Sequence, residues 1–251
     1  MIGVFDSGLG GLTVVKEIFR ELPGYEVLYF GDNARLPYGT KSPKLIKRWS
    51  KEIVKFLLKN GARLIVIACH TTSSLAFEFL KRSFPKIPLF GIANVSIKKA
   101  ALLTKNNKIG VLGTPATINS KFHQRLLLRE NPHLKVFNQA CPLFVPLVEE
   151  GLINHPITLL VAKFYLYPLK KRKVDTLILA CTHYPLLKKV LQKVMGEKVK
   201  IVNPAAELIK ELKNFLEKNQ NLKNKIKKGA SHRFVFSDHP YQFELLSKLC
   251  L

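Results

Sequence analysis

Two cysteines end two similar apolar segments, and their thiols are the groups in this chain best placed to do chemistry. Residues 64–71 (LIVIACHT) run through an apolar stretch of strand length to Cys69. Residues 177–183 (LILACTH) do the same to Cys181. Both segments then continue into threonine and histidine.

An earlier pair of segments repeats as well. Residues 2–7 (IGVFDS) match residues 109–114 (IGVLGT), so one half of the chain is interpreted as a diverged copy of the other. If the two halves face each other, the two thiols lie on opposite sides of one cleft. That arrangement suits the movement of a proton from one face of a carbon atom to the other.

Paired thiols of this kind suit the removal of a proton next to a carboxylate. Carbon acids are weak, so without an electron-sink cofactor the reaction needs a well-placed strong base and an environment that stabilises the carbanion. A thiolate serves as that base if its pKa is tuned, and His183 and Asp6 could bias the two cysteines to opposite protonation states. A single buried cysteine is more often inert, whereas two at matching points of a repeat favour catalysis.

Two turns carry further polar groups. Residues 8–11 (GLGG) lack the full G-x-G-x-x-G spacing of a dinucleotide site, so a tight turn with exposed N–H groups is the favoured interpretation. Asp6 and Ser7, just before it, could hold an ammonium group. Residues 37–39 (PYG) predict a rigid turn that either binds an anion through its N–H groups or is an ordinary surface turn.

Apolar runs alternate with amphipathic stretches of helix length, which is the pattern of an α/β fold. We expect strands at residues 2–5, 26–30, 64–68, 88–92, 109–112, 134–137, 176–180, 199–202 and 233–236. We expect helices at 12–21, 43–59, 74–83, 95–104, 118–130, 156–167, 185–195 and 205–217. Ligands of such folds bind beyond the carboxyl ends of the strands. Side chains expected to converge there are Asp6, Asp32, Cys69, Thr114 and Cys181.

The repeat predicts two pseudo-symmetric α/β domains with mostly parallel sheets and an active site in the cleft between them. The first domain comprises residues 1–94 and 206–251, and the second comprises residues 95–205. A last strand and helix in residues 233–251 are expected to return to the first half. The polar, Lys- and Asn-rich stretch 213–232 is predicted to be mobile.

The composition is that of a folded protein. Hydrophobic residues make up 47% of the 251 residues, and no apolar stretch reaches the roughly 18 residues that cross a bilayer. The chain begins directly with strand-like residues 2–5, which leaves no room for a signal peptide and predicts a cytoplasmic protein. Four cysteines without a CxxC pair predict neither a disulfide framework nor a metal site.

The net charge of +24, from 41 Lys and Arg against 17 Asp and Glu, has two interpretations. It could serve a nucleic-acid partner, or it could reflect lysines spread over solvated helix faces. The lysines are distributed along the whole chain, and no nucleic-acid-binding motif accompanies them. The second interpretation is therefore favoured, and nucleic acid is not expected as a partner.

Several blocks of sequence, in order and spread over most of the chain, resemble the glutamate racemases, the cofactor-independent two-cysteine enzymes of the Asp/Glu racemase family. The blocks are residues 3–8 (GVFDSG), 31–39 (GDNARLPYG), 69–71 (CHT), 113–117 (GTPAT), 141–151 (CPLFVPLVEEG) and 181–185 (CTHYP). The resemblance implies an isomerase that racemises glutamate by 1,1-proton transfer without a cofactor. It further implies a supply of D-glutamate for peptidoglycan in cell-wall biogenesis, and it suggests a homodimer.

The same resemblance assigns roles to individual residues. Cys69 and Cys181 would be the acid/base residues, each serving one enantiomer. Asp6 would assist Cys69, while Glu149 and His183 would assist Cys181. The substrate-binding residues it implies are Asp6 and Ser7 for the amino group, His70, Thr71 and Thr182 for the α-carboxylate, Tyr38 and Gly39 beside Pro37 for the side-chain carboxylate, and Thr114, Thr117 and His183 along the rest of the pocket.

One departure from the family pattern stands beside the first cysteine, where the family has Asn and this chain has His70. Imidazole is bulkier than the Asn amide and titrates near neutral pH. Two alternatives stay open. One is the same chemistry on another acidic amino acid, such as aspartate, and the other is a basic nucleic-acid-binding protein on a racemase scaffold.

Overall fold

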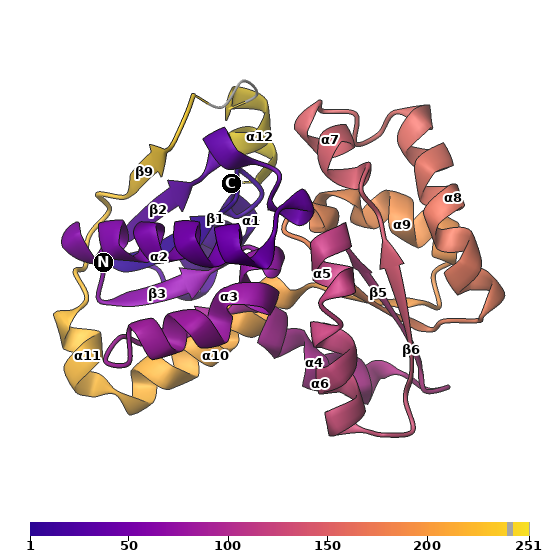
Figure 1. The fold of residues 1–251 in the computed structure, drawn as a ribbon, viewed down its shortest axis with the longest axis horizontal. Helices are drawn as coiled ribbons and strands as arrows, with labels where there is room; N and C mark the ends of the chain where they lie inside the picture. The colour runs from indigo at the N-terminus through magenta and orange to yellow at the C-terminus, as the bar shows by residue number, and fades with distance from the viewer. Residues whose placement is uncertain (240–242, 251) are drawn as a thin grey trace.

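Two parallel β-sheets, each flanked by helices, make up the computed structural model, which describes residues 1–239 and 243–250 (Figure 1). The first sheet has the strand order β4-β3-β1-β2-β9, and the second has the order β6-β5-β7-β8. Every strand pair of these two sheets, over the residues described, is parallel. The predicted α/β class with mostly parallel sheets is confirmed.

All nine predicted strands are present, with small shifts at their ends. The first sheet contains β1 (Ile2–Asp6), β2 (Val27–Gly31), β3 (Leu64–Ile67), β4 (Leu89–Gly91) and β9 (Arg233–Phe236). The second contains β5 (Lys108–Gly113), β6 (Lys135–Ala140), β7 (Thr176–Ala180) and β8 (Lys200–Val202). β1, β3 and β7 are buried at every position, which explains their uninterrupted apolar sequences.

The two sheets repeat one arrangement. The order β4-β3-β1-β2 in the first matches β8-β7-β5-β6 in the second. Strands β1 and β5 each contain a glycine, at the second position of β1 and the third of β5, over which a side chain of the neighbouring strand lies. A Cβ on Gly3 would lie 2.8 Å from Cδ1 of Ile65, and a Cβ on Gly110 would lie 2.6 Å from Cδ2 of Leu177. The sequence repeat therefore corresponds to a repeat in packing.

Helices cover the sheets. Their bounds are α1 (Leu12–Glu21), α2 (Pro43–Lys59), α3 (His70–Ser83), α4 (Ile92–Leu103), α5 (Pro115–Asn119), α6 (Phe122–Glu130), α7 (Phe144–Glu149), α8 (Pro156–Lys171), α9 (Lys188–Met195), α10 (Pro204–Lys218), α11 (Gln220–Lys225) and α12 (Phe243–Cys250), with 3-10 turns η1 (Asn33–Arg35), η2 (Tyr38–Thr40) and η3 (Tyr184–Leu187). Four helices begin with a capping side chain followed by proline, which needs no N–H partner at that position: Ser42-Pro43, Thr114-Pro115, His155-Pro156 and Asn203-Pro204. None of the described helices combines the length and hydropathy that a bilayer span requires.

Several predicted helix bounds were wrong. α3 begins at His70, directly after Cys69, rather than at residue 74. The predicted helix 118–130 is two helices, because Lys121 adopts a left-handed conformation with φ 52°. α8 continues through Pro168 to Lys171, and the short helices α7 and α11 were not predicted.

The polar stretch 213–232, predicted to be mobile, is helical over residues 213–218 and 220–225. α10 extends through it to Lys218, and α11 follows. Leu216 and Ile226 are buried, at 1% and 2% exposure, while the charged side chains between them face outward. The predicted return of the chain to the first half is confirmed, because β9 pairs with β2.

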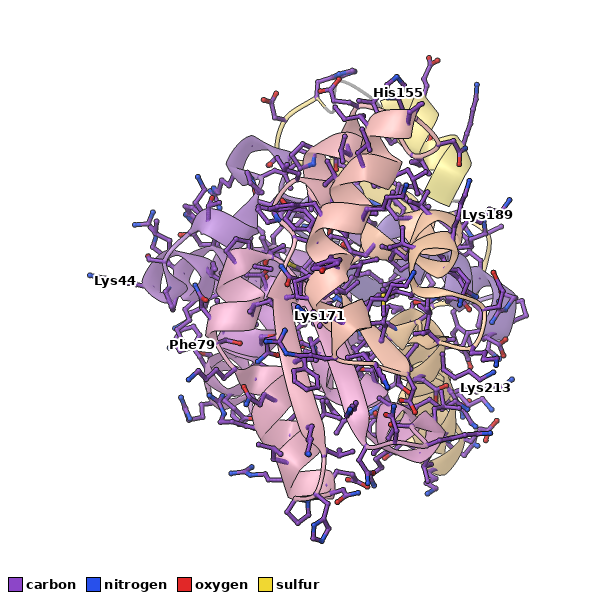
Figure 2. The ribbon with its side chains drawn as sticks, turned by 90° about the vertical axis from the view of Figure 1, so that its right-hand side faces the viewer. Lys44, Phe79, His155, Lys171, Lys189 and Lys213 are labelled. Atoms are coloured by element: carbon purple, nitrogen blue, oxygen red, sulfur yellow. The ribbon has the colours of Figure 1, made fainter. Side chains whose placement is uncertain are left out.

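Basic side chains are spread over the surface. Figure 2 shows Lys44 at the left of the view, Lys171 in the middle, and Lys189 and Lys213 at the right. These four lysines belong to four different helices, α2, α8, α9 and α10.

Candidate active site

Cys69 and Cys181 line one cavity between the two sheets. Cys69 lies between the end of β3 and the start of α3, and Cys181 directly follows β7. Each thiol therefore lies at the carboxyl end of an interior strand of its sheet. The carboxyl ends of these two strands face the same cavity, which is where ligands of open α/β sheets bind.

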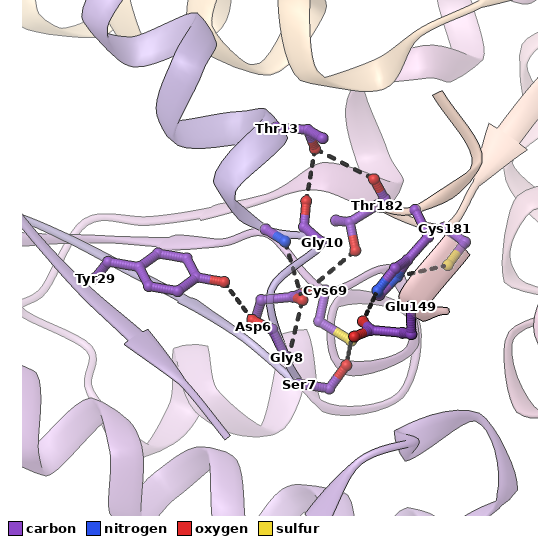
Figure 3. Close-up of polar contacts among 12 residues, drawn as sticks. Asp6, Ser7, Gly8, Gly10, Thr13, Tyr29, Cys69, Glu149, Cys181 and Thr182 are labelled. Carbon is purple, nitrogen blue, oxygen red and sulfur yellow. Dashed lines mark hydrogen bonds and ion pairs between the residues drawn. The ribbon is translucent and has the colours of Figure 1, made fainter. Parts of the chain in front are cut away.

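Cys69 is enclosed together with Ser7. Its Sγ lies 3.7 Å from the Ser7 Oγ, and the residue is 5% exposed (Figure 3). Burial, and then the nearby charge of Asp6, raise the pKa of the Cys69 thiol to about 11. In this arrangement Cys69 is a neutral thiol and can donate a proton.

Asp6 is the last residue of β1 and is buried. Its Oδ2 accepts hydrogen bonds from the N–H groups of Gly8 at 3.2 Å and Gly11 at 3.1 Å, and its Oδ1 accepts one from Thr182 Oγ1 at 3.4 Å (Figure 3). The N–H groups of the glycine turn therefore bind a carboxylate of the chain itself. Burial raises the pKa of Asp6 to about 6, although the charge of His183 and the two N–H groups oppose the rise.

The other thiol belongs to a chain of three groups. Cys181 Sγ lies 3.8 Å from His183 Nδ1, and His183 Nε2 is hydrogen-bonded to Glu149 Oε1 on α7 (Figure 3). Burial disfavours the charged imidazole, but the hydrogen bonds to Cys181 and Glu149 outweigh it and raise the pKa of His183 well above its ordinary value. A cationic imidazole therefore lies beside Cys181.

The two walls of the cavity therefore differ in electrostatics. One carries a neutral thiol beside a buried carboxyl group, and the other carries a thiol beside a cationic imidazole. Unlike environments for two like groups are what separates an acid from a base in one site. The arrangement can hold one cysteine as proton donor and the other as proton acceptor.

Three threonine hydroxyls close the cleft. Thr71 Oγ1, in the first turn of α3, lies 3.1 Å from the hydroxyls of both Thr114 and Thr117 at the start of α5, which lie 3.0 Å apart. The cavity behind them holds about 20 Å³, room for about one water molecule. This is too small for an amino acid, so the cleft must widen before one can enter, and we interpret the structure as a closed form.

Most of the predicted site residues line this cavity, namely Ser7, Pro37, Tyr38, Gly39, Cys69, His70, Thr71, Thr114, Cys181, Thr182 and His183. Asp6, Thr117 and Glu149 are not among the lining residues, but each is hydrogen-bonded to one that is. Asp32, expected to converge on the cleft, is likewise not among the lining residues, but it accepts a hydrogen bond from the hydroxyl of Tyr38, which lines the cavity. Within residues 1–239 and 243–250, no three His, Cys, Asp or Glu side chains are grouped as a metal site requires.

Sequence reasoning missed two apolar lining residues and one histidine. Leu36 and Val145 line the cavity; both lie inside the quoted sequence blocks, but neither has a polar group that would draw attention. His123 packs against His70, and no motif or spacing in the sequence indicates that contact.

Comparison with known proteins gives one consistent family. A family model described as Asp/Glu/Hydantoin racemase matches residues 2–212. The glutamate racemase of Geobacter metallireducens is 45% identical over 242 residues, covering 96% of this chain and 89% of the relative. That of Aquifex aeolicus is 45% identical over 250 residues, covering 100% of this chain and 93% of the relative.

Solved structures agree. The crystal structure of glutamate racemase from Francisella tularensis in complex with D-glutamate has a TM-score of 0.92 at 37% identity, covering 100% of this chain and 92% of that one. An aspartate racemase homologue from Pyrococcus horikoshii, at 19% identity and a TM-score of 0.59, shares only the fold. The chain therefore belongs to the Asp/Glu/Hydantoin racemase family and, within it, to the glutamate racemases.

Proposed function

We propose that this chain interconverts L- and D-glutamate by moving the α-proton between Cys69 and Cys181 without a cofactor. The observation that carries the proposal is the location of both thiols on the wall of one closed cavity, each at the end of an interior strand. The unlike surroundings of the two thiols support a donor and an acceptor. The product D-glutamate would serve peptidoglycan synthesis.

In each turnover one cysteine acts as a thiolate and the other as a thiol. The thiolate removes the α-proton and becomes a thiol, which leaves a carbanion next to the α-carboxylate. The opposite thiol then protonates the other face of that carbon and becomes the thiolate, so atoms and electrons balance. The two cysteines have exchanged protonation states, and the enzyme is ready for the opposite enantiomer.

The negative charge that develops on the substrate needs a preorganised partner. The buried imidazole of His183, with its raised pKa and its bond to Glu149, provides a positive charge beside Cys181. Closure of the threonine cluster excludes water, and a dry site strengthens this electrostatic stabilisation.

Each charged group of glutamate has its own partners in this proposal. The ammonium group would bind Asp6 and Ser7. The α-carboxylate would bind His70, Thr71 and Thr182. The side-chain carboxylate would bind the turn of Pro37, Tyr38 and Gly39. Thr114 and Thr117 complete the pocket. The hydroxyl of Tyr38 is already bonded to Asp32. The turn would therefore bind the side-chain carboxylate of glutamate through the backbone N–H groups of Tyr38 and Gly39.

Two further features of the proposal concern organisation and compartment. The domain boundaries at 1–94 with 206–251, and at 95–205, are supported by strands β1–β4 and β9 sharing one sheet and β5–β8 the other. Thiols that work as acid and base must stay reduced, which supports a cytoplasmic location.

The test is incubation of the purified protein with L-glutamate and, separately, D-glutamate in D2O without added cofactor. Proton NMR follows loss of the α-proton, and circular dichroism follows loss of optical activity. We expect both signals to decay from either enantiomer. If the protein turns over aspartate but not glutamate, the proposed substrate becomes aspartate. If it acts on neither amino acid and binds DNA or RNA in a salt-sensitive way, the nucleic-acid alternative is favoured.

A methyl group on Gly39 should oppose closure of the cleft. A Cβ at this position would lie 2.5 Å from the Cβ of Thr114, which belongs to the other half. We therefore expect Gly39→Ala to lower kcat/KM by about 10²-fold, since small misplacements at an active site have effects of that size. The melting temperature should change little, because the strain is relieved when the halves separate. Lys41→Ala, just after the same turn, is the control and should keep full activity. If Gly39→Ala has the kinetics of the wild type, the closed form is not the form that reacts.

A further inference from the structure

Two buried histidines from opposite halves of the chain meet beside the cavity. His70 is the first residue of α3 and His123 is the second residue of α6. Their ring centroids lie 6.0 Å apart with an interplanar angle of 23°, so the rings are stacked. Each residue is only 2% exposed.

Among the residues that the structure describes, three ring nitrogens of this pair have no hydrogen-bond partner. They are Nδ1 and Nε2 of His70 and Nε2 of His123. A buried polar group without a partner is costly, and native structures contain few of them, so each one needs an explanation. Since His70 lines the cavity and His123 does not, the unpaired nitrogens of His70 indicate a ligand that enters the cavity.

The chemistry of His70 fits a carboxylate. Burial, and then the neighbouring His123, keep the pKa of His70 well below its ordinary value, so the ring is neutral and carries one N–H donor. Burial lowers the pKa of His123 to about 4 as well. A neutral ring offers one donor and one acceptor, and only the correct orientation presents the donor to the substrate.

We propose that His123 is a positioning residue, which packs against the imidazole of His70 and holds it in the orientation in which its N–H binds a substrate carboxylate. This inference rests on the proposed function and deepens it. The terminal torsion of histidine is broad, so the plane of the His70 ring could otherwise tilt. The stacked ring of His123 holds that plane.

The contact also depends on closure of the cleft. His70 belongs to the half that contains the first sheet, while His123 follows β5 of the second. The adjacent Thr71 meets Thr114 and Thr117 of the second half in the same first turn of α3. The orientation of His70 is therefore set at the moment when the substrate is enclosed.

A double-mutant cycle tests the inference. His123→Ala should raise the dissociation constant for glutamate, measured by calorimetric titration, about tenfold, as expected when a hydrogen bond to a charged group is lost. In a His70→Asn background the same change should have less than about a twofold effect, because His123 then has no ring to position. His123→Phe keeps an aromatic stacking partner and should restore most of the affinity. His133→Ala, at an exposed histidine of the same half, is the matched control.

The imidazole signals of His70 provide a second readout. In ¹⁵N-edited NMR of the wild type with glutamate bound, we expect one sharp set of His70 imidazole signals, and in His123→Ala we expect these signals to broaden as the ring moves. Equal effects of His123→Ala in both backgrounds, with equally sharp His70 signals throughout, would overturn the positioning role. If the protein racemises glutamate but His123→Ala has equal effects in both backgrounds, only this inference is refuted. If the protein binds glutamate and the two substitutions are coupled, but no racemisation occurs, only the proposed function is refuted.

Discussion

Serine in place of either Cys69 or Cys181 should lower the rate of glutamate racemisation by about 10²- to 10⁴-fold, the range that a positioned acid or base contributes. A serine hydroxyl is a much weaker acid than a thiol, so it neither forms the base nor donates the proton at a useful rate. Both faces of the α-carbon must be served in each turnover. Each substitution alone should therefore slow inversion in both directions, as polarimetry or circular dichroism would show.

The remaining cysteine should still act on its own face. In D2O, Cys181→Ser should exchange the α-proton of the enantiomer that presents it to Cys69, without inverting it, and Cys69→Ser should do so for the other enantiomer. Because enantiomers have equal free energy, kcat/KM for the two directions stays equal in every variant. The asymmetry is therefore visible only in exchange, which proton NMR measures for each enantiomer separately.

Cys141 provides the control for this experiment. It is the third buried thiol among the described residues, and it does not line the cavity. Cys141→Ser should retain the rate of the parent protein. Full racemisation by Cys69→Ser or Cys181→Ser would end the two-base mechanism.

Asparagine in place of Asp6 should make the protein more stable and less active. Burial raises the pKa of Asp6 from 3.8 to about 6, so the folded state binds more protons than the unfolded state between these values. Stability therefore falls as pH rises through this window, and above it the charged carboxylate costs at most about 3 kcal/mol. Asn removes this cost, because its carbonyl can accept the hydrogen bonds from Gly8 and Gly11 and its amide can donate to Thr182.

The measurement is the melting temperature of Asp6→Asn and wild type across this pH range. The variant should melt several degrees higher above pH 6, and the difference should vanish below pH 3.8. The racemisation rate should fall, because the carboxylate beside Cys69 is lost. Asp175→Asn is the contrast: hydrogen bonds from Thr104, Lys105 and Asn106 outweigh burial and lower the pKa of Asp175, so its loss should reduce stability above pH 3.8. Lower stability of Asp6→Asn at high pH would contradict the burial argument.

The sequence predicts the sheets well because their signal is local. An apolar run of strand length that stops at a polar residue, as at Cys69 and Cys181, is what a buried parallel strand needs. Helix ends were less predictable, since the first turn of α3 starts with a histidine and three residues of hydroxyl type that have no strong helix preference. α7 is too short to show a period, and it contains Pro146.

The residues of the site also fall into two groups, those that the sequence predicts and those that it does not. Residues within the motifs, such as Tyr38 and Thr182, could be named from the sequence, and they do line the cavity. The close approach of Thr71 to Thr114, and the stacking of His70 on His123, depend on how the two halves meet. No spacing along the chain encodes that distance, so these contacts required the structure.

The late return of the chain to its first sheet has a consequence for how the protein is made. β9 covers the outer edge of β2, and α10 packs against both α1 and α4. All the strands of the second sheet are synthesised before α10 and β9. The first sheet is thus completed only after the second, and until β9 is made the outer edge of β2 is an open sheet edge, which is the strand that needs protection from aggregation.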